Sequence, residues 1–321
     1  MRLPKRLDTI LKKKEAFLND VRAKLEKTVL KLQISLFEQV IGDIIPRLDV
    51  RDGVILETTN NYRLISELEK TYDTFNLKIV KTLLPQINEG IKKITKFSQD
   101  YFTIALAGNL PGRFEKIIES AKVITNLKIG LRAEKMIRGG QLMSMLDSKE
   151  ALTELKQLLS KAVTSQIDMK EFIKLIKEKI NGTEEKVGSL ERQFKRYAYD
   201  TYAQYDSAYN KKLAEEFGMR YFIYQGGLVI DSRDFCVCHN GKVFSIEETE
   251  DWKDWTPDQC DYPDSHPMQS KEGTKYPPNV VPGYLQVPGY DPLVDRGGYN
   301  CRHIIGWIAD ELAYKYRPEL K

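Results

Sequence analysis

The first part of the chain repeats apolar residues at intervals of three and four positions, the spacing of one face of an α-helix. This pattern predicts a helix over residues 7–45, which Pro46 ends. A second helix is expected over residues 61–102, and Pro85 within it should kink or split it. Between the two, residues 54–56 follow an Asp-Gly turn and predict a short strand.

Three more helices are expected before residue 218. Residues 147–163 and 168–180 each show the helical period, and Gly182 suits the C-cap of the second. A long helix is predicted over residues 184–217, and Gly218 should close it. Tyrosines recur along this last helix at helical spacing, which favours a core or a contact with a partner helix over a surface for stacking bases.

After Gly218 the pattern changes to short runs of β-branched and aromatic residues. Residues 219–230 predict two short strands or a hairpin, and residues 303–316 predict a strand followed by a short helix. Proline, glycine, aspartate and tyrosine dominate residues 256–298, which should be irregular apart from an edge strand over 280–288.

These patterns predict an α+β protein, with a mostly α-helical N-terminal two-thirds followed by a small mixed α/β, loop-rich C-terminal domain. We expect a helical region over residues 1–190, a linking helix over 191–218 and the C-terminal domain over 219–321. No apolar run approaches the roughly 18 residues of a membrane span. The N-terminus lacks the apolar core of a signal peptide, so neither a membrane partner nor secretion is expected.

Charge is distributed unevenly along the 321 residues. Residues 221–321 contain 10 Lys and Arg against 16 Asp and Glu, whereas the rest of the chain contains 40 against 30. The basic side chains nearest the N-terminus are Arg2, Lys5, Arg6, Lys12, Lys13 and Lys14. They indicate a solvated helix face, a contact with DNA phosphates without sequence preference, or a contact with an acidic protein partner. Apolar residues on the same helix favour the protein partner.

The C-terminal domain concentrates the cysteines and histidines. The most economical zinc set would be Cys236, Cys238, Cys301 and His303, since zinc takes four thiolate or imidazole ligands. However, Cys-x-Cys on a strand would send its two thiols to opposite faces, so both could bind only across a turn. Buried structural thiols and a Cys236–Cys301 disulfide are the alternatives, with reduced thiols expected in a cytoplasm.

A hydrolytic centre is a further alternative. Asp231, Arg233, His239, Arg302 and His303 could supply an acid, a base and phosphoryl contacts, as in a ribonuclease. No motif fixes a nucleophile or a pair of metal-binding carboxylates. The structural alternative is that these charged residues anchor turns.

Two segments of this domain, taken together, resemble the C-terminal domain of the phage Mu F-like minor head proteins, also called phage head morphogenesis proteins. The matching positions are Tyr224, Gly226, Gly227, Asp231, Ser232, Arg233, Phe235, Cys236, Gly241, Lys242, Val243, Trp252, Gly297, Gly298, Cys301, Arg302 and His303. Asp234 stands where that family has proline. The similarity covers residues 219–307, about a third of the chain, and does not include Cys238, which counts against a zinc site that needs it.

The resemblance implies a non-enzymatic structural protein of a tailed-phage or prophage head, without a cofactor. Such a protein would assemble in the host cytoplasm with portal, major capsid or scaffold proteins. In the virion it would lie inside the head or at the portal vertex and could touch packaged DNA. The matching Cys, Arg and His residues would then define the fold. A nuclease- or toxin-like effector that uses the His/Arg cluster, and a zinc-dependent nucleic-acid-binding protein, are the alternatives.

Overall fold

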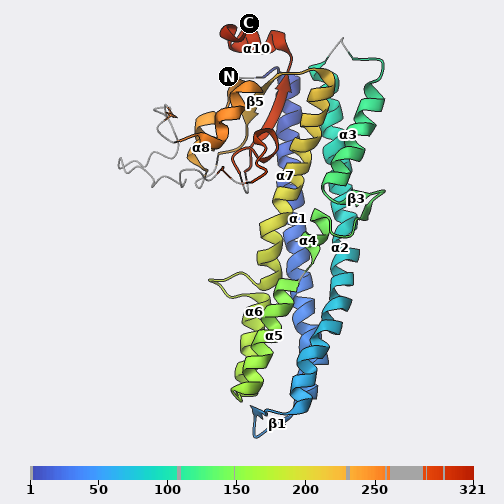
Figure 1. Ribbon diagram of the computed structural model, residues 1–321, viewed down its shortest axis with the longest axis vertical. Helices are drawn as coiled ribbons and strands as arrows, with labels where there is room; N and C mark the ends of the chain where they lie inside the picture. Colours follow the sequence, from blue (N-terminus) through green and yellow to red (C-terminus); the bar gives the residue numbers. More distant parts are fainter. Residues whose placement is uncertain are drawn as a thin grey trace. The chain divides into compact units, whose positions relative to one another are not determined.

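The computed structural model describes residues 3–106, 110–147, 149–228, 232–256, 259–260, 285–286, 288–298 and 301–321 (Figure 1). The predicted class is confirmed: the chain is α+β, with a large helical majority and small antiparallel sheets. Among the described residues, no helix is both long enough and apolar enough to cross a bilayer.

Helices account for most of the described residues. The α-helices are α1 (Lys5–Asp43), α2 (Thr59–Ala105), α3 (Phe114–Lys128), α4 (Gln141–Leu146), α5 (Lys149–Thr164), α6 (Met169–Asn181), α7 (Ser189–Phe217), α8 (Asp234–His239), α9 (Pro292–Asp295) and α10 (Asp310–Tyr316). Short 3-10 helices are η1 (Ile45–Arg47), η2 (Glu247–Asp254) and η4 (Pro318–Leu320). The strands are β1 (Val50–Arg51), β2 (Val54–Ile55), β3 (Leu131–Arg132), β4 (Lys135–Met136), β5 (Tyr221–Gln225), β6 (Lys242–Ser245) and β7 (Ile304–Ile308).

Each helix predicted from the periodicity is present, with two differences in detail, and α3, α4 and α8 are additional helices. Pro85 lies inside α2 without splitting it into two helices. The last long helix, α7, begins at Ser189, because an isolated bridge between Gly182 and Val187 holds the preceding residues in a turn. The strand and helix predicted at the C-terminus are β7 and α10. The edge strand predicted at 280–288 lies largely outside the described residues.

The chain divides into two compact units that are not consecutive in sequence. One, the sheet unit, consists of Met1–Asn19, Ile91–Arg132 and Asp200–Lys321. The other, the helical unit, consists of Asp20–Gly90 and Ala133–Tyr199. This division differs from the expected series 1–190, 191–218 and 219–321, because α1, α2 and α7 each contribute to both units.

The helical unit packs the facing sides of α1, α2, α5 and α6. In Figure 1, α5 and α6 lie side by side and a turn containing β1 joins α1 to α2. The short strand predicted at residues 54–56 is β2, and it pairs antiparallel with β1, which the sequence did not predict. The buried Asn61 holds that hairpin to the start of α2: its side-chain amide donates to the carbonyls of Asp49 and Leu56 and accepts from the Asp49 amide.

The sheet unit contains a three-stranded antiparallel sheet in the order β6-β5-β7. Since β5 is the central strand, it is buried on both faces. On one face Gly306 of β7 is so close to the helices that a Cβ there would lie 2.7 Å from Leu11 Cδ1 of α1 and 3.2 Å from the Tyr101 hydroxyl of α2. Tyr101 also donates to the carbonyl of Trp307, 2.8 Å away. The start of α1 and the end of α2 therefore form one cover of the sheet.

An aromatic layer from α8 and η2 covers the other face. Trp252 of η2 lies edge-on to Phe222 and Tyr224 of β5 and to Phe235 of α8, with ring centroids 5.1–5.9 Å apart. All four side chains are almost fully buried. This layer brings α8 against the sheet and positions Cys236, one of the two cysteines of that helix.

Candidate functional site

Tyr224 lies at the centre of the site. β5 alternates its side chains, so Phe222 and Tyr224 both face the aromatic layer. The Tyr224 ring stacks on the His303 imidazole with centroids 4.8 Å apart, and its hydroxyl lies 3.4 Å from Cys236 Sγ and 3.3 Å from Cys301 Sγ.

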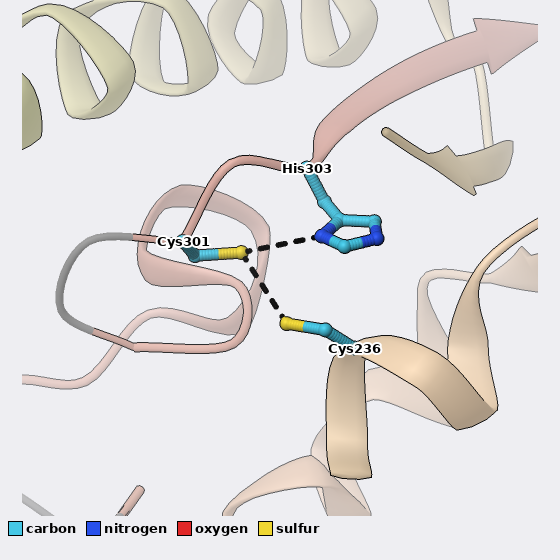
Figure 2. A group of neighbouring side chains, drawn as sticks. All are labelled: Cys236, Cys301 and His303. Carbon is cyan, nitrogen blue, oxygen red and sulfur yellow. Dashed lines mark hydrogen bonds between the residues drawn. The ribbon is translucent and has the colours of Figure 1, made fainter. Parts of the chain in front are cut away.

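Cys236, Cys301 and His303 converge from two segments of the chain that are far apart in sequence (Figure 2). Cys236 lies on α8, Cys301 in the loop before β7, and His303 directly before the first residue of β7. The two sulfurs are 3.7 Å apart, and Cys301 Sγ is 3.9 Å from His303 Nδ1. All three side chains are 2–3% exposed. The sequence prediction that the two distant segments share one core at these residues agrees with this geometry.

Two glycines allow this close approach. A Cβ on Gly297 would lie 2.5 Å from Cys236 Sγ and 3.3 Å from Cys301 Sγ. A Cβ on Gly226 would lie 2.8 Å from the Cα of His303. Any side chain at either position would therefore separate the two segments that bring the cysteines and the histidine together.

Two arginines anchor the loop that carries Gly297. Arg233 donates to the Gly297 carbonyl at 3.2 Å. Arg296 is 2% exposed and donates to Ser207 Oγ at 2.6 Å and to the Ala203 carbonyl at 3.2 Å, both on α7. Sequence reasoning missed Arg296, and its only signal was its position next to the Gly-Gly pair of the motif.

The pKa values of the two free thiols are shifted in opposite directions. Burial raises the pKa of Cys301, but hydrogen bonds from Cys236 and His303 and the charge of Arg296 outweigh it and hold that pKa well below its usual range. The hydrogen bond with Cys301, and burial, raise the pKa of Cys236 well above its usual range. Burial likewise raises the pKa of Tyr224, whose hydroxyl therefore stays protonated and able to donate.

Cys238 does not join this cluster, contrary to the four-ligand zinc set considered from the sequence. It forms a disulfide with Cys260, with the two Cα atoms 5.7 Å apart. The segment is helical rather than extended, and residues two apart on a helix point about 200° apart, so Cys236 and Cys238 still diverge. The expectation that every thiol is reduced is also wrong, and the disulfide does not involve Cys236 or Cys301.

Among the residues that the structure describes, those of the hydrolytic alternative do not meet at an open surface. His239 is 6% exposed, packs on Phe235 with ring centroids 3.9 Å apart, and engages the Phe235 carbonyl through Nδ1 at 2.7 Å. Burial lowers the pKa of His239 to about 4, so it is neutral near pH 7. Arg233 contacts a loop carbonyl, Arg302 is half-buried, and Asp231 lies outside the described residues.

The remaining motif residues support turns and packing. The amide of Gly241, at φ +77°, donates to the Tyr224 carbonyl in the turn between α8 and β6. Gly298, at φ +82°, accepts from the Cys301 amide. Phe235 is fully buried, and Ser232 is half-buried at the start of the loop to α8.

The basic N-terminal residues differ sharply in exposure. Lys14 is 1% exposed and pairs with Asp206 of α7 at 2.7 Å, so it cannot belong to an exposed basic surface. It falls on the buried stripe of α1 with Leu11 and Leu18, which is why it faces inward. Lys5, Arg6, Lys12 and Lys13 are exposed, and Arg2 lies outside the described residues. The apolar face that favoured a protein partner is thus largely covered by the chain itself.

Comparisons with protein-family models, with curated proteins and with solved structures find no match to this chain.

Proposed function

We propose that this chain is a structural, non-enzymatic component of a tailed-phage or prophage head, as its resemblance to the Mu F-like minor head proteins implies. It would assemble with portal, capsid or scaffold proteins in the host cytoplasm and remain in the virion. The observation that carries the proposal is that motif residues from distant segments of the chain contact one another in the folded protein.

Motif residues from segments about 60 positions apart contact one another. Gly226 lies against His303, Gly297 lies against Cys236, and Arg233 binds the Gly297 carbonyl. In these contacts the main chain of one segment packs closely against residues of the other, in the interior of the protein. Such roles fit a motif that defines a fold, and they account for its glycines as well as its polar residues.

The same burial argues against catalysis at the cluster. A general acid or base must reach the proton that it transfers, directly or through one water. His303 and Cys301 are each 2% exposed, and the neutral His239 is enclosed by aromatic rings. The nuclease-like alternative would require this layer to open.

Analysis of assembled particles tests the proposal. Prophage induction in the strain that encodes the chain should yield procapsids and heads that contain it by mass spectrometry, and deletion of its gene should lower the infectious titre. Absence of the chain from both kinds of particle would overturn the proposal. So would digestion of DNA or RNA by the purified chain, if His303→Ala abolished that digestion.

A further inference from the structure

We propose that Cys236, Cys301 and His303 supply three of the four ligands of one zinc ion, that a water molecule completes the tetrahedron, and that the ion joins α8 to the start of β7. This inference concerns the purified chain and does not depend on the function proposed above. It differs from the ligand set suggested by the sequence, because Cys238 is committed to Cys260.

The distances between the ligand atoms suit zinc. In a tetrahedral site with zinc–sulfur bonds of about 2.3 Å, two thiolate sulfurs lie about 3.8 Å apart. The observed separation of the Cys236 and Cys301 sulfurs is 3.7 Å. One ligand atom from each of the three residues lies within 4.8 Å of the other two. Cys301 Sγ lies 3.9 Å from His303 Nδ1, against about 3.6 Å between a sulfur and a nitrogen ligand of one tetrahedral zinc ion, so the imidazole must move toward the two sulfurs when the ion binds.

The charges of the ligand set also favour a divalent ion. Two thiolates and one neutral imidazole around Zn²⁺ form a unit with no net charge, which a buried site can hold without a large desolvation cost. Thiolate and imidazole ligands select zinc over magnesium or calcium, which prefer oxygen. The Tyr224 hydroxyl, within 3.4 Å of both sulfurs, can donate a hydrogen bond that orients the thiolates.

The surroundings leave the three ligands available. Among the described residues, His303 Nε2 is buried without a hydrogen-bond partner, and Nδ1 contacts only the sulfur of Cys301 at 3.9 Å. No protein oxygen within the described part of the chain competes for the imidazole. Gly297 leaves room beside both sulfurs that a Cβ would fill, and Figure 2 shows the three side chains directed toward one another.

Burial implies that the ion enters while the domain folds. Metal binding of this kind adds to the stability of the folded state, so removal of the ion should destabilise the chain. A Cys236–Cys301 disulfide is the competing fate of the same two thiols, since it would need only an oxidant and a shorter sulfur–sulfur distance.

The test uses the untagged full-length chain, because a histidine tag would bind metal itself. After expression with added zinc and desalting under reducing conditions, elemental analysis should find about one zinc ion per chain. Replacement by Co²⁺ should give the intense visible bands of a tetrahedral site and a thiolate-to-cobalt charge-transfer band. X-ray absorption at the zinc edge should find two sulfur ligands.

Matched variants separate this cluster from the other cysteines. Cys238→Ser/Cys260→Ser removes two cysteines and should keep the zinc, whereas Cys301→Ala should lose it. If Cys301→Ala does not fold, the cobalt spectrum and the sulfur count of the wild-type chain still decide. Zinc below about a tenth of an ion per chain, four sulfur ligands, or a Cys236–Cys301 disulfide in the reduced preparation would each overturn the proposal.

Discussion

Gly297 is the residue whose lack of a side chain matters most to the cluster. Because a Cβ would lie 2.5 Å from Cys236 Sγ, Gly297→Ala should push α8 away from the loop before β7. Overpacking of this kind costs about 1–3 kcal/mol, which thermal unfolding would register as a fall of several degrees in Tm. Gly112→Ala is the control, since nothing lies within 4 Å of that Cβ. Equal melting temperatures for both variants would show that a Cβ at position 297 does not displace α8.

His239 should make the stability of the chain depend on pH. Burial, with the charges of Lys242 and His303, lowers the pKa of His239 to about 4, although the hydrogen bond that its ring donates to the Phe235 carbonyl acts in the opposite direction. The unfolded state therefore binds a proton at higher pH than the folded state, so stability present above about pH 6.5 is lost as the pH falls toward 4. The loss attributable to His239 is about 3 kcal/mol at most.

Urea unfolding of the wild-type chain and of His239→Gln between pH 7 and pH 4.5 measures this loss. The variant cannot titrate at this position, so the difference in unfolding free energy between the two chains should shrink as the pH falls. Parallel pH profiles would show that His239 does not contribute.

At the scale of elements, α1, α2 and α7 of the sheet unit meet around a buried polar group. Lys14 Nζ lies 2.7 Å from Asp206 Oδ1 and 3.1 Å from Ser98 Oγ, and the Asn210 amide donates to the same carboxylate oxygen at 2.9 Å. Lys14→Met would leave the Asp206 carboxylate buried without its cation, which should cost about 3–5 kcal/mol.

The pair between Lys12 and Asp8 provides a control at the same distance of 2.7 Å, but Lys12 is 70% exposed. Lys12→Met should therefore change the unfolding free energy by less than about 1 kcal/mol. The double variant Lys14→Met/Asp206→Leu should recover most of the stability that Lys14→Met loses. Equal losses of unfolding free energy for Lys12→Met and Lys14→Met would refute the claim that the buried pair contributes more to stability than the exposed one.

The same helices show what the sequence could and could not predict. Apolar spacing predicted α1, α2, α5 and α6 well, because one buried face repeats along each helix. The sequence pattern assigned Lys14 to a basic surface because its side chain is charged. Its position in the helical repeat, however, lies on the buried stripe of α1. Its partner Asp206 is 192 residues away, and no local pattern links them.

The cluster of Cys236, Cys301 and His303 was also only partly predictable from the sequence. The motif indicated that Cys236, Cys301 and His303 belong together, but only the fold shows that α8 is helical and that Cys238 turns toward Cys260. Arg296 escaped notice because its buried guanidinium depends on Ser207 of α7, which lies 89 residues earlier in the chain. Long-range packing therefore decided what local patterns left open.

For the whole molecule, the C-terminal segment is not a separable domain. Leu11 of α1 and Tyr101 of α2 cover one face of the β6-β5-β7 sheet. A fragment that begins near residue 190 would expose that face to water. Experiments on the cluster therefore need the full chain.

Charge at the start of α1 is the remaining feature through which the whole molecule could meet DNA. Once Lys14 is excluded, the exposed basic residues there are Lys5, Arg6, Lys12 and Lys13. With much of the apolar face of this helix buried in the chain, phosphate contact without sequence preference becomes the interaction to test. Replacement of all four residues by Gln should lower the slope of log affinity against log salt by about 3 to 4 units.

The control replaces four exposed lysines of the helical unit, Lys161, Lys170, Lys174 and Lys177, by Gln. Both variants reduce the formal net charge of the chain from +4 to zero, so only the position of the lost charge differs. Binding to duplexes of unrelated sequence, measured across a salt series, should weaken for the α1 variant and change much less for the control. Because a general effect of net charge would alter both variants equally, equal slopes in the two would exclude a DNA contact centred on α1.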